Sequence, residues 1–186
     1  MANGSKAKYV VMGMLNAGPL TGYDIKKRFE GSIVKFWDLN YGQIYPTLKN
    51  LLEREGFVER TLVSSENRPN SKVYTLTGKG RQKLTDWLSG NVNKERLKYE
   101  IFLKLFFGSQ ISVEENIGNI REFRSKNLEE LKNLEYFEED REEVFKGSLN
   151  EKKRCYLVAM LMRDVHKACI EWADKAIEIL EKTSAL

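Results

Sequence analysis

His166 and Cys169 are the residues of this sequence whose types and spacing come nearest to catalytic chemistry. They stand three positions apart in an expected helix and so share one face, where the imidazole could activate the thiol as a nucleophile. Such catalysis also needs a group that orients the histidine and an oxyanion pocket, and the sequence suggests neither. We therefore expect no enzymatic activity from this pair.

The sequence gives no better support for a metal site or a nucleotide-binding site. His166 is the single histidine, and no second ligand pair stands at zinc spacing around it. The acidic run 138–143 is interpreted as a solvated helix face or helix end, because no neighbouring histidine completes a carboxylate metal site. Gly78-Lys79-Gly80 lacks the flanking spacing of a nucleotide-binding loop. The sequence predicts neither a metal nor a cofactor.

The two cysteines, Cys155 and Cys169, lie fourteen residues apart in one strongly helical stretch. At 1.5 Å per residue they stand roughly 21 Å apart, too far for a disulfide. Free thiols in a reducing cytoplasm are favoured over a redox pair. A thiol-based redox sensor stays open as an alternative function.

Basic residues are distributed unevenly along the chain. The 186 residues carry a formal net charge of +4, but residues 1–90 hold 14 Lys and Arg against 8 Asp and Glu. Residues 91–186 hold 17 against 19. This asymmetry indicates a basic binding half joined to a neutral half with another task. Apolar stretches fall far short of the ~20 residues of a membrane helix, so we expect a cytoplasmic protein.

The first third of the chain predicts three helices. Apolar spacing favours a helix over residues 6–17, and Thr21 with Asp24 forms a capping box for a second helix. Ile44, Leu48, Leu51 and Leu52 mark a third helix, which Gly56 ends as a left-handed cap. A small amphipathic helix of this kind can enter a DNA major groove.

A β-hairpin and a fourth helix follow. The β-rich runs 57–63 and 72–76 flank a polar, partly basic segment, and a helix follows Thr77. Three helices, a hairpin and another helix are the order of a winged helix-turn-helix, in which the hairpin is the wing.

Three motifs make residues 7–90 resemble the PadR family of bacterial transcriptional regulators. These are Gly22-Tyr23 in the second helix, Gln43-Ile44-Tyr45-Pro46 in the third, and Tyr74-x-Leu76-Thr77-x-x-Gly80-Arg81 leaving the wing. Asn67 and Ser71 depart from the glycine and arginine that are common in the wing of this family, whereas Arg68 and Lys72 remain there. The resemblance implies DNA binding, in most members repression, and release by a small effector, often aromatic or amphipathic.

The second half predicts a helical domain. Residues 96–107 are apolar almost all round and are expected to be buried between layers, and Ser112 with Glu115 forms a capping box for a long helix. A final helix to about residue 182 carries an apolar stripe that is too broad for one partner helix. A second copy of the chain is the expected partner, and in larger PadR members the resemblance implies such a dimer. The expected dimer contacts are Leu157, Leu161, Val165 and Trp172.

These observations combine into one hypothesis. The fold is mostly α with a small β-hairpin wing, with a winged helix DNA-binding domain over 1–90 and an antiparallel helical dimerisation domain over 91–186. We expect the chain to be a dimeric repressor that binds double-stranded DNA sequence-specifically, at an inverted-repeat operator. The alternative is an adaptor that binds a protein through its helical half. Trp87, Phe106 and Phe107 are the candidates for effector binding. The candidate phosphate contacts are Lys26, Lys27, Lys49, Lys72, Lys79 and Arg81; the base-edge candidates are Gln43, Tyr45 and Asn50; Tyr41 and, in the minor groove, Arg68 complete the interface.

Overall fold

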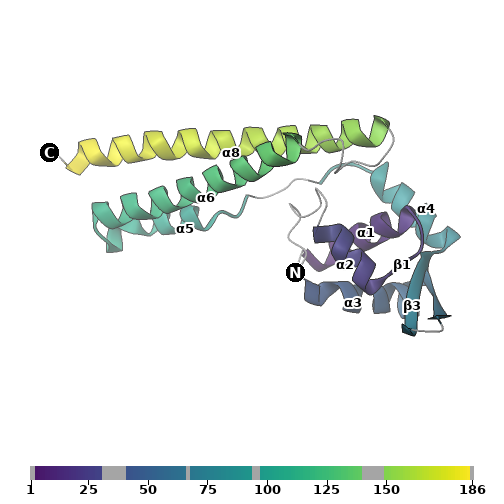
Figure 1. Ribbon diagram of the computed structural model, residues 1–186. Coiled ribbons are helices and arrows are strands. Elements are labelled where there is room, and N and C mark those ends of the chain that lie inside the picture. The colour runs from purple at the N-terminus through teal and green to yellow at the C-terminus, as the bar shows by residue number, and fades with distance from the viewer. Residues whose placement is uncertain (1–2, 31–40, 66–67, 94–96, 140–148, 185–186) are drawn as a thin grey trace. The chain divides into compact units, whose positions relative to one another are not determined.

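A computed structural model of the chain describes residues 3–30, 41–65, 68–93, 97–139 and 149–184. The chain divides into two compact units, residues 1–93 and 94–186, and each is described here by itself. Figure 1 shows a small mixed unit of helices and strands and a second unit made of helices. No helix among the described residues is long and apolar enough to cross a lipid bilayer.

The described residues of the first unit form four α-helices and a three-stranded antiparallel sheet of order β1-β3-β2. The predicted hairpin is confirmed, with Val58 paired to Leu76 at its base and Leu62 to Lys72 further out. The sequence did not predict the short first strand, which adds to β3 through the pair Leu20 and Tyr74. The elements are α1 (Asn3–Asn16), β1 (Leu20–Thr21), α2 (Gly22–Glu30), α3 (Tyr41–Asn50), the π-helical turn η2 (Leu51–Glu55), β2 (Val58–Ser65), β3 (Arg68–Leu76) and α4 (Gly78–Leu88).

One apolar core holds these elements together. Val11 of α1, Ile25 of α2 and Leu48 of α3 are buried side by side with Leu76 of the sheet and Leu84 of α4. Each lies at the position that helical or alternating spacing predicts, so the helical faces and the inner sheet face cover one another.

The turn after α3 has the predicted left-handed glycine. Gly56 has φ of 65°, and its N–H donates to the carbonyl oxygen of Leu51. The Phe57 N–H donates to the same oxygen at 2.9 Å. A side chain is strained at this φ, which accounts for glycine where the helix passes into the sheet.

The capping box that opens α2 is also confirmed. The Asp24 carboxylate accepts from the Thr21 N–H at 3.0 Å and from its hydroxyl at 2.7 Å, and the Thr21 hydroxyl accepts from the Asp24 N–H at 3.1 Å. The hydroxyl and N–H of Thr21, helped by Arg28 and Lys27, hold the pKa of the Asp24 carboxyl below its usual value. The charged form of Asp24 therefore stabilises the start of α2.

Replacing Asp24 by alanine is expected to lower the free energy of unfolding by about 1 kcal/mol at pH 7. Because folding lowers the Asp24 pKa, its contribution is present above the unfolded value near 3.8 and disappears as pH falls through the folded value. Denaturant unfolding of the two proteins from pH 7 to pH 2.5 measures this difference. A difference that stays constant over this range would contradict the role of the charge.

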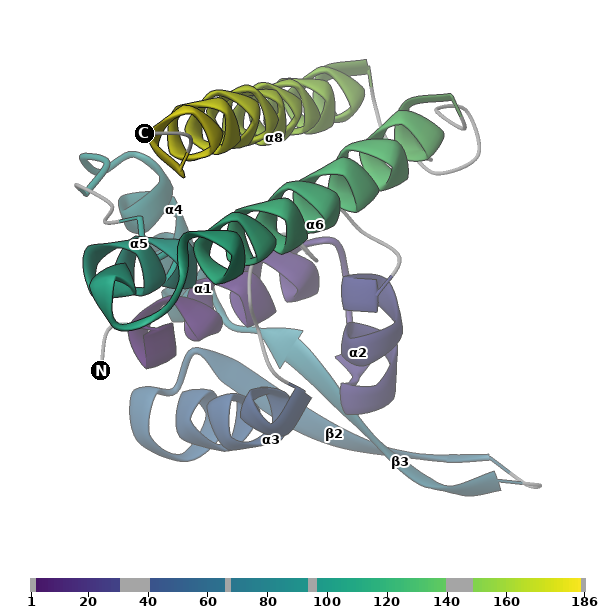
Figure 2. The ribbon, with the colours of Figure 1, turned by 90° about the vertical axis from the view of Figure 1, so that its left-hand side faces the viewer.

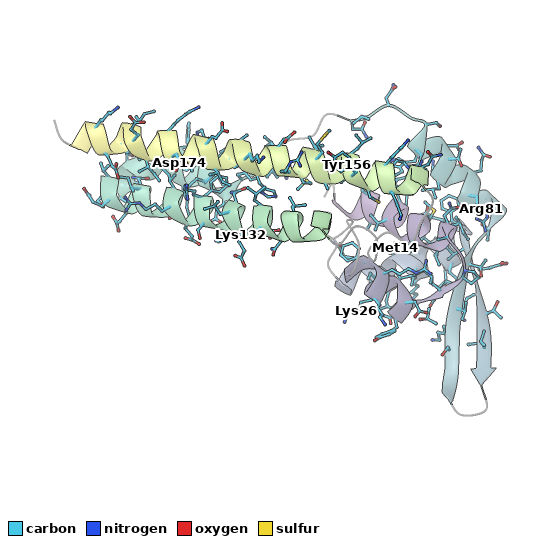
Figure 3. The ribbon with its side chains drawn as sticks, turned by 45° about the horizontal axis from the view of Figure 1, so that its top comes forward. Met14, Lys26, Arg81, Lys132, Tyr156 and Asp174 are labelled. Atoms are coloured by element: carbon cyan, nitrogen blue, oxygen red, sulfur yellow. The ribbon has the colours of Figure 1, made fainter. Side chains whose placement is uncertain are left out.

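In the part of the second unit that the structure describes, the helices are two long antiparallel ones and a short one. Ion pairs join Arg121 to Glu181 at 3.1 Å and Arg124 to Asp174 at 2.6 Å. The earlier residue of the first long helix thus pairs with the later residue of the second, as in an antiparallel arrangement. Figure 2 shows α6 and α8 running side by side, and Figure 3 marks Asp174 on α8. The elements are α5 (Glu100–Phe106), the 3-10 turn η3 (Gly108–Gln110), α6 (Val113–Glu139) and α8 (Leu149–Ser184).

The start of α6 and its core agree with the sequence. The predicted capping box is confirmed, since the Ser112 N–H donates to the Glu115 carboxylate at 2.8 Å and the Ser112 hydroxyl accepts from the Glu115 N–H at 3.1 Å. Ile101 of α5, Ile120 of α6 and Ala173 of α8 form a buried apolar cluster that joins the three helices.

The predicted burial of residues 96–107 is wrong for the single chain. Residues 94–96 lie outside the described part, α5 begins at Glu100, and Ile101 is its buried residue. Phe102, Phe106 and Phe107 are 47%, 82% and 63% exposed. The physical reason is that α5 meets the rest of its unit along one face, so its other apolar residues remain uncovered.

Candidate nucleic-acid interface

The outward face of α3 carries the most exposed of the predicted base contacts. Ile44 and Leu48 point into the core, which leaves Tyr45 and Lys49 facing solvent. The Tyr45 side chain is 60% exposed, and the Lys49 ammonium lies 4.0 Å from the Glu53 carboxylate in an exposed pair. Such an exposed ion pair contributes little to folding stability, so Lys49 can leave Glu53 for a ligand at a small cost in free energy.

An open hollow joins this face to α2 and the wing. Tyr45 of α3 lines it together with Tyr23 of α2 and Lys72 of β3. Tyr23 is 66% exposed, although Tyr23 was not among the predicted contacts. Tyr74 and the Asp24 carboxylate also line the hollow. The exposed hydroxyls of Tyr23 and Tyr45 and the Lys72 ammonium are donors suited to a DNA phosphate.

Gly22 explains how Tyr45 reaches this position. A Cβ atom on Gly22 would lie 2.6 Å from Cε1 of the Tyr45 ring. Glycine at the start of α2 therefore lets α3 approach with its tyrosine held against the α2 backbone, which accounts for one motif that the sequence carries.

Gln43 and Asn50 lie at the border of α3 that faces α1. Both are half-buried and line a second hollow together with Lys8 of α1. The Asn50 amide donates to the Glu55 carboxylate at 2.6 Å. As base contacts both residues stay predictions, and Asn50 already has an intramolecular partner.

Two of the predicted phosphate contacts also have partners within the first unit. The Lys79 ammonium donates to the Glu55 carbonyl oxygen at 2.9 Å and lies 5.2 Å from the centre of the Phe57 ring. The Arg81 guanidinium donates to the Asn16 side chain at 3.2 Å. Figure 3 labels Arg81 on α4 and Lys26 on α2, on different sides of the unit.

The remaining predicted contacts are placed in part. Lys26 and Lys27 stand on α2, Lys27 exposed and Lys26 half-buried. Tyr41 begins α3 and Arg68 begins β3, but their side chains lie outside the described part. Residues 31–40, which connect α2 to α3, also lie outside it.

Glu55 is the residue of this region that sequence reasoning overlooked. It ends η2, where the helix dipole is negative and an acidic side chain is unfavourable without a cation. The Lys8 ammonium supplies that cation at 3.0 Å. An acid in the last turn before a capping glycine was the signal in the sequence.

The predicted effector residues fall in both units. Trp87 of α4 stacks on Tyr9 of α1 with ring centres 4.3 Å apart, and Phe106 meets Phe107 edge to face at 5.0 Å in the second unit. Each of these three residues is therefore described within its own unit, and their shared role stays a prediction.

The predicted dimer contacts lie along α8. Leu157 and Leu161 are 55% and 62% exposed, and Val165 is half-buried. Trp172 packs edge to face on Phe123 of α6 with ring centres 5.7 Å apart and keeps 38% exposure. Among the described residues of the second unit, little covers the apolar surface toward the start of α8.

The residues singled out for redox, metal or catalytic chemistry are placed as follows. Cys155 and Cys169 lie on α8 and are not joined in a disulfide, and the His166 ring nitrogen Nδ1 lies 2.8 Å from the Asn127 side-chain oxygen. Burial lowers the pKa of His166. Among the described residues no His, Cys, Asp and Glu cluster could hold a metal, and 140–143 of the acidic run lie outside them.

A core of three helices, a third helix with an exposed face and an adjoining β-hairpin define a winged helix-turn-helix protein. Residues 11–86 match the transcriptional regulator PadR-like family, and residues 97–181 match the C-terminal region of the virulence activator alpha family. The chain is 36% identical over 129 residues to the negative transcriptional regulator PadR of Bacillus subtilis, covering 69% of this chain and 70% of the relative.

Solved structures agree with the sequence matches. Bacillus subtilis PadR in complex with operator DNA is 30% identical with a TM-score of 0.76, covering 93% of this chain and 98% of that one. The same regulator with p-coumaric acid gives 30% identity and a TM-score of 0.73, covering 94% and 98%. The chain belongs to the PadR-like family of transcriptional regulators, a family of regulators rather than enzymes.

Proposed function

We propose that the protein is a sequence-specific transcriptional repressor that binds an inverted-repeat operator as a dimer and leaves it when a small effector binds. The observation that carries the proposal is the exposed face of α3, which bears Tyr45 and Lys49 and on which Tyr45 shares a hollow with the wing residue Lys72. A related regulator has been crystallised in complex with operator DNA, and its structure aligns with 93% of the length of this chain.

The uncovered apolar residues support the dimer. Four large apolar side chains of the second unit are more than half exposed: Phe106, Phe107, Leu157 and Leu161. Exposed apolar residues that gather in patches are typical of protein–protein interfaces. A two-fold dimer covers such surfaces and supplies two recognition helices, and the usual half-site spacing is about 34–36 Å.

Two features of the relatives support repression and release. One relative is named a negative transcriptional regulator, and the same regulator has been crystallised with p-coumaric acid. An aromatic acid could stack on exposed aromatic side chains, and we retain Trp87, Phe106 and Phe107 as candidate contacts.

Replacing Lys49 by alanine is expected to weaken operator binding and to lower the slope of log affinity against log salt by about one unit. The reason is that one phosphate contact, with its released counterion, disappears. Fluorescence anisotropy over a range of salt concentrations measures both quantities. The control is Lys132→Ala on α6, which removes an exposed lysine from the second unit. Equal slopes for the Lys49 variant and the wild type would remove Lys49 from the interface.

A further inference from the structure

We propose that Glu55 is a positioning residue for DNA binding, which fixes the end of the recognition helix against α1 and α4. The inference rests on the proposed function, because it concerns how α3 is presented to the operator. Glu55 is the last residue of η2, the π-helical turn that continues α3.

The carboxylate of Glu55 joins two helices through separate oxygens. The Lys8 ammonium of α1 lies 3.0 Å from Oε2, and the Asn50 amide of α3 donates to Oε1 at 2.6 Å. The Lys8 and Glu55 side chains are 24% and 22% exposed, compared with 72% and 57% for the nearby pair Lys49 and Glu53. Solvent therefore screens the Glu55 pair less.

The backbone around Glu55 is tied to the start of α4. Lys79 donates to the Glu55 carbonyl oxygen and the Thr77 hydroxyl to the Gly56 carbonyl oxygen, both at 2.9 Å. The ammonium groups of Lys8 and Lys79 lie 5.9 Å and 5.2 Å from the centre of the Phe57 ring, within the range of cation–π attraction. One acidic residue and the turn that follows it thus connect α1, α3 and α4.

Helices α1 and α4 are in turn fixed to each other. Tyr9 stacks on Trp87 with 10° between the ring planes, and Arg81 donates to Asn16. Glu55 attaches the recognition helix to this pair of helices. The roles of two predicted DNA contacts change accordingly: Asn50 and Lys79 orient α3 through Glu55.

The test compares Glu55→Gln with Glu53→Gln, which removes an equal charge from the exposed side of the same turn. The probes are the inverted-repeat duplex that the wild-type protein selects from random-sequence DNA and a duplex of equal composition with scrambled half-sites. If Glu55 acts only as a charge, its loss strengthens binding to both duplexes, as expected for Glu53→Gln.

The positioning role predicts the opposite sign for the selected duplex. Glu55→Gln lowers the affinity for it about tenfold and does not lower the affinity for the scrambled duplex, so the ratio of the two affinities falls at least about tenfold. A ratio equal to that of the wild type or of Glu53→Gln, or an equal loss on both duplexes, would overturn the inference. A wild-type protein that selects no duplex would overturn the proposed function instead.

Lys8→Met provides a second variant in case Glu55→Gln does not fold, which circular dichroism at the assay temperature reveals. Lys8→Met leaves Glu55 without its cation and is expected to lower the same affinity ratio, with the double variant no worse than either single one. A wild-type ratio for a folded Lys8→Met protein would contradict the proposal.

Discussion

Replacing Leu161 by glutamate is expected to convert the proposed dimer into a monomer and to weaken operator binding on the order of a hundredfold. Leu161 is 62% exposed on α8, beside the similarly exposed Leu157. A carboxylate at this position would be buried without a partner in the proposed two-fold interface. The loss of affinity follows because a monomer holds one half-site at a time.

Sedimentation equilibrium and operator titration measure the two effects on the same preparation. Lys167→Gln is the matched control, because it changes the net charge by the same amount at another exposed position of α8. The control is expected to remain dimeric with wild-type affinity. A Leu161→Glu protein that stays dimeric would remove this part of α8 from the interface.

Replacing Gly80 by alanine is expected to lower the free energy of unfolding of the first unit by about 2–4 kcal/mol. A Cβ atom there would lie 2.1 Å from the Phe57 carbonyl oxygen and 2.8 Å from the Leu76 side chain. The Phe57 oxygen accepts from the Thr77 N–H at 3.0 Å, so it cannot retreat without breaking the junction between α4 and the sheet.

Gly78→Ala is the matched control two residues earlier in α4, where a new Cβ atom meets nothing within 4 Å. Alanine is a better helix former than glycine, so this change is expected to be neutral or slightly stabilising. Denaturant unfolding followed by circular dichroism measures both variants. Equal stability of the two would show that the α4 backbone can move away from Phe57.

Local patterns predicted most of the first unit and the start of α6 in the second. The capping boxes at Thr21 and Ser112 and the left-handed Gly56 follow from contacts within a few residues, and all three are present. The strand Leu20–Thr21 is different: it depends on pairing with β3 more than fifty residues away. A two-residue segment has no periodicity that could reveal such a pairing.

The spacing of residues in the sequence could not reveal the contacts of Glu55 either. In an α-helix, side chains four apart share a face, whereas the wider π-helical turn brings Asn50 and Glu55, five apart, within hydrogen-bond distance. A helical wheel places the Asn50 amide on the free face of α3, and the structure turns it toward Lys8 and Glu55 instead.

The exposed apolar residues of the second unit show a different limit. The apolar character of residues 96–107 predicts burial of Phe102, Phe106 and Phe107, which the structure leaves exposed. Hydrophobicity does not say whether the covering surface belongs to the same chain or to another one. Their exposure in one chain corrects the expectation of burial between layers and becomes an argument for the proposed second copy.

The central claim is that the winged unit binds a specific duplex mainly through its phosphates, with two copies on two half-sites. Its most direct test is a titration of the selected inverted-repeat duplex with wild-type protein at several salt concentrations, together with a map of the protected bases. Two protected half-sites with centres about 10 base pairs apart are expected, together with an affinity that falls steeply with salt. No retardation of any duplex at low salt, or an affinity independent of salt, would contradict the claim.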